Sequence, residues 1–170
     1  MSQPIFIPEP YIMLAEYNQW MNQRLYALIA TIPDELRHRD LGAYFKSIHG
    51  TLSHILYGDL AWMERLALRQ YTPQKIDQHR FDDFEELQAE RVKVDTWILA
   101  WAQTLTAEQL SADFTYISNV DGGTRVRPTW ALVSHLFNHQ THHRGQLTTI
   151  LHQQGYDVGV TDIPWLPRWD

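Results

Sequence analysis

The chain has 170 residues, no cysteine and a formal net charge of −6 with its histidines neutral, and its 44% apolar and 20% charged residues are typical of a globular protein. The lack of cysteine excludes disulfides, thiolate metal ligands and a cysteine nucleophile, while the acidic charge argues against non-specific binding to nucleic acid. No stretch approaches the roughly 18 consecutive apolar residues of a membrane span, and the N-terminus lacks a signal-peptide pattern, so we expect a cytoplasmic protein with neither a membrane nor a nucleic-acid partner.

Three long helices are predicted first along the chain. Pro10 can begin the first helix, which Pro33 closes, and apolar residues recur between these prolines at intervals of three and four. A second helix is predicted over about residues 44–68. The third helix opens where Asp82 or Asp83 can cap its N-terminus.

The pattern changes after the third helix. Thr106 can cap a short helical turn. Two strand-like segments, FTYISNV and TRVRPT, then flank the Asp-Gly-Gly at residues 121–123, which predicts a hairpin turn whose glycines take positive φ. The last long helix is predicted to start at residues 128–129 and to end at Gly155 in the C′ position.

The segment after Gly155 is too rich in proline to be helical, and we expect it to pack back onto the helices through Trp165 and Trp169. Four long helices favour an all-α fold, namely a four-helix bundle with a short hairpin-like excursion between the third and fourth helices. We expect residues 1–170 to form a single domain, because a chain of this length can bury one core.

The segment HLFNHQTHHRGQ in the last helix carries four histidines, His135, His139, His142 and His143. At about 100° per residue, His139 and His143 lie one turn apart and lean toward the apolar face, whereas His142 leans toward solvent. Such a pair can bind one divalent ion, and burying two imidazoles without a shared purpose would cost desolvation twice. A histidine on a helix is nevertheless more often a surface or hydrogen-bonded residue, so the pattern alone leaves both interpretations open.

A metal site of this kind needs a third protein ligand. The candidates are several carboxylates and four histidines: His49, His54, His79 and His152. On the second helix, His54 shares its face with small residues such as Gly58, which indicates either close helix packing or a cavity floor with one imidazole in it. The spacing does not choose between His49 and His54.

Other polar residues have less certain roles. Asp59 lies within the apolar arc of the second helix, where we expect an ion pair with an arginine such as Arg144, or as the alternative a contact to a ligand imidazole. Gln146 falls close to His139 on the last helix and can line a pocket beside it. We expect His135 and His142 to be solvated.

Taken in order, YNQWMNQRL, SIHGTLSHILYGDLAWMERL, the Gly-rich hairpin, HLFNHQTHHRGQL and TDIPWL resemble the DinB family, also called DinB/YfiT-like, over essentially the whole chain. The HxxNHxxxHRGQ segment is the most specific part. The resemblance implies a four-helix bundle whose second and fourth helices hold a divalent metal through three histidines. Carried onto this sequence, they are His54, His139 and His143, so the resemblance favours His54 over His49.

Three neutral imidazoles leave coordination positions for water or substrate, as in catalytic sites, and nitrogen ligands suit nickel or zinc without discriminating between them. The resemblance implies a metal-dependent enzyme acting on a small molecule, with transfer of a low-molecular-weight thiol as the leading hypothesis. The alternatives are a metal-dependent hydrolase, although no HExxH motif is present, and a non-catalytic metal-binding or interaction bundle. A two-fold homodimer is the simplest assembly we expect of such a bundle.

Overall fold

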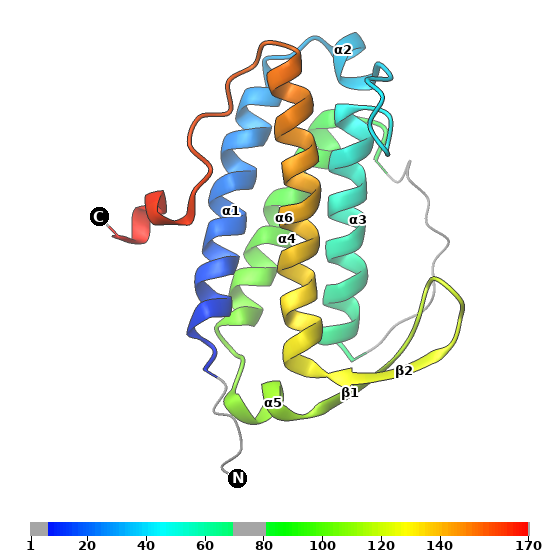
Figure 1. Ribbon diagram of the computed structural model, residues 1–170, viewed down its shortest axis with the longest axis vertical. Coiled ribbons are helices and arrows are strands. Elements are labelled where there is room, and N and C mark those ends of the chain that lie inside the picture. The colour runs from blue at the N-terminus through cyan, green and yellow to red at the C-terminus, as the bar shows by residue number, and fades with distance from the viewer. Residues whose placement is uncertain (1–6, 70–80, 170) are drawn as a thin grey trace.

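The chain is mostly helical and carries one small two-stranded sheet (Figure 1). The computed structural model describes residues 7–69 and 81–169. Along these residues the elements are α1 (Glu9–Ala30), α2 (Asp34–His38), α3 (Ile48–Leu66), α4 (Phe84–Ala102), α5 (Ala107–Ser111), β1 (Asp113–Ile117), β2 (Thr124–Pro128) and α6 (Thr129–Gln153), followed by short 3-10 turns at Ile163–Trp165 and Pro167–Trp169.

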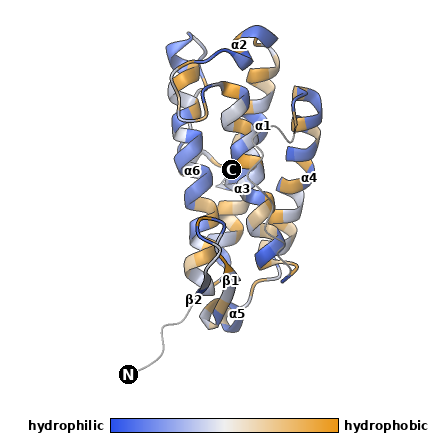
Figure 2. Ribbon diagram, turned by 90° about the vertical axis from the view of Figure 1, so that its right-hand side faces the viewer, coloured by the Kyte–Doolittle hydropathy of each residue, from blue (hydrophilic) through white to orange (hydrophobic). Residues whose placement is uncertain are grey.

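The long helices α1, α3, α4 and α6 run side by side along the long axis of the molecule (Figure 1). Helix α1 packs against α4 and α6, and α3 packs against the same two helices. Hydrophobic and hydrophilic residues alternate in bands along these helices (Figure 2), which lets each helix turn an apolar side inward. Fully buried side chains come from all four helices and include Met21, Leu25, Leu56, Met63, Leu87, Ile98, Leu147 and Leu151.

Capping residues explain where the inner helices begin. The side chain of Ser47 accepts a hydrogen bond from the Gly50 N–H at the start of α3 (3.0 Å). Asp83, one of the two predicted caps, starts α4, and Thr106 caps α5 as predicted. The helix predicted over about residues 44–68 is therefore shorter at its start, because its first residues form a loop that ends at the Ser47 cap.

The predicted hairpin is a true antiparallel sheet, in which β1 pairs with β2. The expected all-α class is therefore only partly right. Gly122 takes a positive φ of 68°, as predicted, but Gly123 is not among the glycines with positive φ. A two-residue hairpin turn of type I′ needs two residues with positive φ. The connection between β1 and β2 spans residues 118–123 and is longer, so one residue with positive φ is enough to reverse the chain.

The C-terminal tail lies beside α1 (Figure 1) and is held there differently from our expectation. Trp165 and Trp169 are 66% and 56% exposed, so the prediction that they anchor the tail is wrong. Leu166 is buried instead, and the Tyr17 hydroxyl of α1 donates to the carbonyl of Thr161 (2.6 Å). The partly buried side chains of Val158 and Ile163 pack against the core beside Leu166, while the two tryptophans remain exposed.

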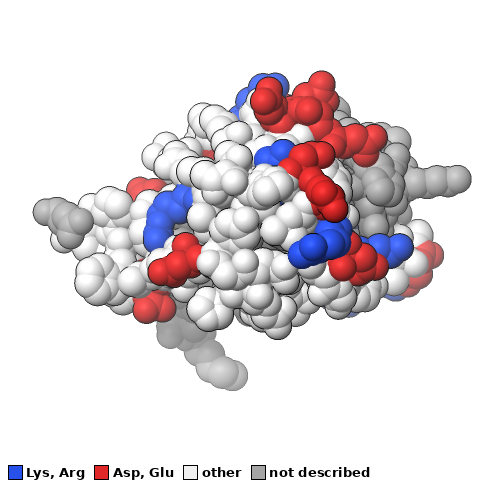
Figure 3. Space-filling model, turned by 90° about the horizontal axis from the view of Figure 1, so that it is seen from above, with Lys and Arg blue, Asp and Glu red and all other residues white. Residues whose placement is uncertain are grey.

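Charged residues of both signs lie on the end of the molecule seen in Figure 3, where acidic side chains gather along one edge. On that face the lysines and arginines are scattered among acidic residues and do not form a broad basic patch. Within the described ranges 7–69 and 81–169, no helix has both the length and the apolar character needed to cross a membrane.

Candidate metal centre

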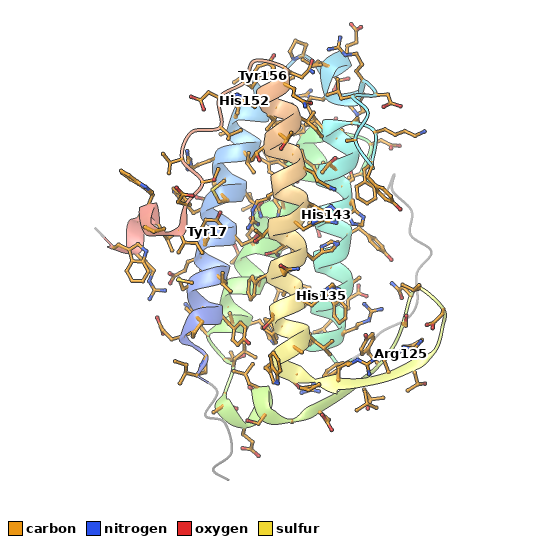
Figure 4. All side chains as sticks on the ribbon, in the orientation of Figure 1. Tyr17, Arg125, His135, His143, His152 and Tyr156 are labelled. Atoms are coloured by element: carbon orange, nitrogen blue, oxygen red, sulfur yellow. The ribbon has the colours of Figure 1, made fainter. Side chains whose placement is uncertain are left out.

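Three histidine side chains that the sequence singled out meet between α3 and α6. The Nε2 atom of His54 lies 3.2 Å from the Nε2 of His139 and 3.2 Å from the Nε2 of His143. One ring nitrogen from each residue falls within 4.8 Å of the others, and we call these residues the histidine triad. Figure 4 shows His143 on the part of α6 that borders α3. Within the part of the chain that the structure describes, this is the one group of three or more such side chains that could hold a metal ion.

The packing of α3 on α6 depends on a glycine at this point. A Cβ atom on Gly58 would lie 2.6 Å from Cε1 of His139 and 3.1 Å from its Nδ1. Any larger residue at Gly58 would therefore push the His139 imidazole out of place. The small residues on this face of α3, whose purpose the sequence left open, here admit an imidazole between two closely packed helices.

The spacing of the triad fits a metal ion. Two nitrogens bound at about 2.0–2.1 Å to one tetrahedral Zn²⁺ are about 3.3 Å apart, close to the separations from His54. Hydrogen bonding alone accounts for the arrangement less well, because one Nε2 faces two other ring nitrogens and has at most one proton to share.

The electrostatics of the triad also suit a cation. Burial, together with the neighbouring His143, lowers the pKa of His54 to about 4. Burial likewise lowers the pKa of His139 to about 3, with contributions from His143 and His54. Both imidazoles are therefore neutral at pH 7 and keep the lone pair that coordination requires.

The remaining histidines lie outside the triad. His49, the alternative to His54, is buried, and its Nε2 lies 2.7 Å from the carbonyl oxygen of Phe81. His142 and His152 on α6 are exposed, as the helical wheel predicted for His142. His79 lies outside the described residues.

His135 is exposed, as expected, but stands in an aromatic row that leads to the triad. Its ring lies 5.0 Å from that of Trp62 on α3 and 5.9 Å from that of His139. Trp62 in turn packs edge-on against Tyr116 of β1 (5.4 Å). Arg65 lies over Trp62 and donates to the carbonyl of Ile117 (3.1 Å), so the hairpin is fastened to α3 below the triad.

Gln146 fixes the orientation of one triad imidazole. Its Oε1 lies 2.8 Å from Nδ1 of His143, so Nδ1–H donates to Gln146 and Nε2 is left with its lone pair toward the other histidines. The sequence placed Gln146 beside His139, whereas the structure places it against His143. Gln146 also lines a groove of about 480 Å³ between α6 and the loop before α3, but His139, beside which the pocket was expected, does not line this groove.

Asp59 belongs to a buried network behind the triad. Its carboxylate pairs with Arg91 of α4 (2.5 Å) and accepts a hydrogen bond from the Gln140 amide of α6 (2.8 Å). The predicted ion pair therefore exists, but the suggested partner was wrong, because Arg144 donates to Asn18 of α1 instead. Arg91 of α4 faces Asp59 in place of Arg144. The alternative prediction, a contact between Asp59 and a ligand imidazole, is not met, because one carboxylate oxygen pairs with Arg91 and the other accepts from Gln140.

One aromatic side chain at the triad was not predicted. The ring of Phe45 stacks on His54, with ring centroids 3.8 Å apart and planes 18° from parallel. Phe45 falls within the helix predicted over about residues 44–68, whereas the structure places it in the loop between α2 and α3. Its position could not be read from the sequence.

Long helices that bring three imidazoles together, one of them buried and two half-buried, define a class of helical proteins with a candidate metal site. The chain belongs to the DinB family, whose sequence profile matches residues 1–170. It is 32% identical over 158 residues to Protein DinB of Bacillus subtilis (strain 168), covering 88% of each chain. A crystal structure of a DinB-like protein from Bacillus cereus ATCC 10987 has a similar fold, with a TM-score of 0.61, 18% identity, and coverage of 83% of this chain and 90% of that one.

Proposed function

We propose that the chain is a metal-dependent enzyme with the form of a four-helix bundle, in which His54, His139 and His143 hold one Zn²⁺ or Ni²⁺ ion. The observation that carries this proposal is the convergence of three imidazole nitrogens on one point between α3 and α6. Residues 1–170, which the family profile spans, are proposed to form one domain.

An open coordination position supports a catalytic role. Among residues 7–69 and 81–169, no fourth histidine, aspartate or glutamate joins the triad. Structural zinc sites are closed by four protein ligands, whereas catalytic sites have three and leave a position for water or substrate. Gln146, which contacts the triad residue His143, also lines a groove of about 480 Å³ that has room for a small molecule, although the triad itself does not line it.

A bound ion would supply Lewis acidity either to a thiol sulfur or to a water molecule. We propose the first of these, with a low-molecular-weight thiol as the small-molecule substrate of a transferase. The chain has no cysteine, so a sulfur nucleophile must come from outside. Hydrolysis is the second candidate. It is less favoured because Asp59, a carboxylate that α3 offers as a general base, already pairs with Arg91 and Gln140 and is fully buried. A non-catalytic metal-binding bundle remains the third.

The proposal is tested on protein purified without a nickel column. We expect about one transition-metal ion per chain, and we expect Co²⁺ to replace it. Adding a small thiol such as 2-mercaptoethanol to the Co²⁺ form should produce a sulfur-to-cobalt charge-transfer band in the near ultraviolet. Binding of Co²⁺ without a thiol band would point to the hydrolase or the non-catalytic alternative. Failure to bind Zn²⁺, Ni²⁺ or Co²⁺ would overturn the proposal as a whole.

Gln146→Ala should weaken Zn²⁺ binding by about 10–100-fold, because the His143 imidazole loses the hydrogen bond that orients it. The matched control is Gln153→Ala, which removes the same side chain from an exposed position on the same helix and in the same groove. Competition with a chromophoric chelator measures both affinities. Equal affinities in the two variants would show that Gln146 does not orient the site.

A further inference from the structure

The three imidazoles of the triad are held in place by different contacts. His143 donates to Gln146, and His139 lies against the bare backbone of Gly58. Nδ1 of His54, like Nδ1 of His139, is buried and finds no hydrogen-bond partner among the described residues, and His54 has no glycine backbone against its ring. A metal-binding histidine usually donates its second ring N–H to an acceptor that fixes the ring, so His54 must be oriented by some other contact.

The ring of Phe45 provides that contact. The Phe45 ring stacks on the His54 ring, with centroids 3.8 Å apart and an interplanar angle of 18°. It also packs edge-to-face with the His143 ring, with centroids 5.4 Å apart. Phe45 is only 8% exposed, so its ring is held between the loop and the triad. A stacked neighbour restricts the plane of an imidazole even without a hydrogen bond.

The loop that carries Phe45 is tightly constrained. Leu41 N–H donates to the carbonyl of Lys46, and Lys46 N–H donates to the carbonyl of Ala43, both at 2.8 Å. Lys46 has a φ of 65°, in the left-handed region that residues with side chains rarely adopt. Backbone strain of this kind persists only where the surroundings enforce it, and it gathers at functional sites.

The first turn of helix α3 is in close contact with the backbone of this loop. A Cβ atom on Gly50, in the first turn of α3, would collide with the carbonyl oxygen of Phe45. The Ser47 side chain accepts from the Gly50 N–H, so the same turn also ties the end of the loop to the helix that carries His54.

We infer that Phe45 is a positioning residue of the metal centre, held by the strained turn at Lys46 and the close approach at Gly50. Its ring fixes the His54 imidazole so that Nε2 faces His139 and His143. The inference rests on the proposed function for its metal-binding consequence, but the orientation of His54 is a property of the chain itself.

The first experiment compares Phe45→Leu with wild type. Leucine keeps an apolar side chain in place but has no ring, so we expect Zn²⁺ binding to weaken by about 10–100-fold, as when other supports of metal ligands are removed. Phe45→Tyr, which keeps the ring, should bind within about twofold of wild type. The matched control is Phe84→Leu, the same change at a residue that is 5% exposed but stacks on Tyr26 of α1 instead of a triad imidazole. Wild-type affinity in Phe45→Leu would overturn the inference.

A second pair of variants tests the loop with Phe45 and all three ligands intact. Gly50→Ala should displace the Phe45 carbonyl and weaken Zn²⁺ binding, whereas Gly145→Ala, which adds a methyl group into open space on α6, should leave binding unchanged. Equal affinities in these two variants would contradict the role assigned to the loop.

Nuclear magnetic resonance on the metal-free protein separates this inference from the proposed function. The His54 ring protons, assigned by comparison with His54→Asn, should be shifted by the Phe45 ring current in wild type and should lose that shift and broaden in Phe45→Leu. If wild type bound no metal but showed this difference, the proposed function would fall and the positioning role would stand. Identical His54 resonances in both proteins would refute the positioning role whatever the metal affinity.

Discussion

Zn²⁺ and Ni²⁺ should bind His139→Ala about 100-fold or more weakly than wild type, while His152→Ala should bind as wild type does. His139 offers its Nε2 to the point where the triad meets, at 3.2 Å from that of His54. His152 lies near the end of the same helix and is exposed, which makes it a matched control for the loss of one imidazole. Metal content after dialysis and competition with a chelator measure the two effects.

The size of this effect follows from the energy of a bound ion. Zinc sites with four protein ligands bind with about 10–16 kcal/mol, so each ligand contributes several kcal/mol. A loss of only about 2.7 kcal/mol already weakens binding 100-fold. His54→Ala should behave like His139→Ala, because both remove a converging nitrogen. If either variant retained one metal ion per chain, that ion would have to be held by residues other than the triad.

The metal-free Arg91→Met variant should lose about 3–5 kcal/mol of unfolding free energy relative to metal-free wild type. Arg91 of α4 pairs with Asp59 of α3 (2.5 Å) and with Asp95 one turn along α4 (2.9 Å), and all three side chains are buried. Without Arg91, two carboxylates are left inside the protein with no cation in contact. Urea unfolding of both proteins in the presence of a chelator measures the difference.

Lys93→Met is the matched control for this prediction. Lys93 lies on the same helix and pairs with Glu90 at 3.0 Å, but its side chain is 72% exposed. Exposed ion pairs of this kind contribute little, so the change should stay within about 0.5 kcal/mol. Equal losses in the two variants would show that burial of the Arg91 network does not set its importance.

The loss in Arg91→Met should also grow with pH. Burial raises the pKa of Asp95 from its ordinary 3.8 to about 6 in the folded protein, against the opposing influence of Arg91. A carboxyl with a raised folded pKa stabilises the fold below about pH 4 and loses that contribution as pH rises through the folded value. Removal of Arg91 raises the folded pKa further, so the variant continues to lose stability where wild type has stopped. The difference between the proteins should therefore be larger at about pH 8 than at about pH 5.

The helices could be predicted from the sequence because their signals are local. Proline, the caps Asp83 and Thr106 and the recurring apolar residues each act within one or two turns. The partner of Asp59 could not be predicted in the same way, because the choice between Arg91 and Arg144 depends on how the helices are rotated against one another. The prediction that Trp165 and Trp169 anchor the tail failed for a related reason, because a proline-rich sequence does not determine which of its side chains will face the helices.

The candidate site was predictable in part. Helical periodicity selected His139 and His143, which do converge in the structure. Periodicity could not separate His49 from His54 on α3, and the family resemblance favoured His54. The structure gives the physical difference, since His49 is turned toward the Phe81 carbonyl and away from α6. The small-residue face of α3 indicated that Gly58 admits a close neighbour, but that this neighbour is His139 of α6, and that the loop before α3 folds Phe45 onto His54, depends on tertiary packing.

The order in which the triad residues occur along the chain bears on how the protein matures during synthesis. His54 precedes His139 by 85 residues, so an unfinished chain that lacks α6 offers one triad imidazole and no site. Because α6 begins only at Thr129, the three imidazoles can converge only after α6 has been made and α3 has docked against it. An ion bound at the proposed site would then stabilise only the chains whose distant segments have already met. It would thus favour chains in which α3 and α6 are correctly docked over misassembled ones.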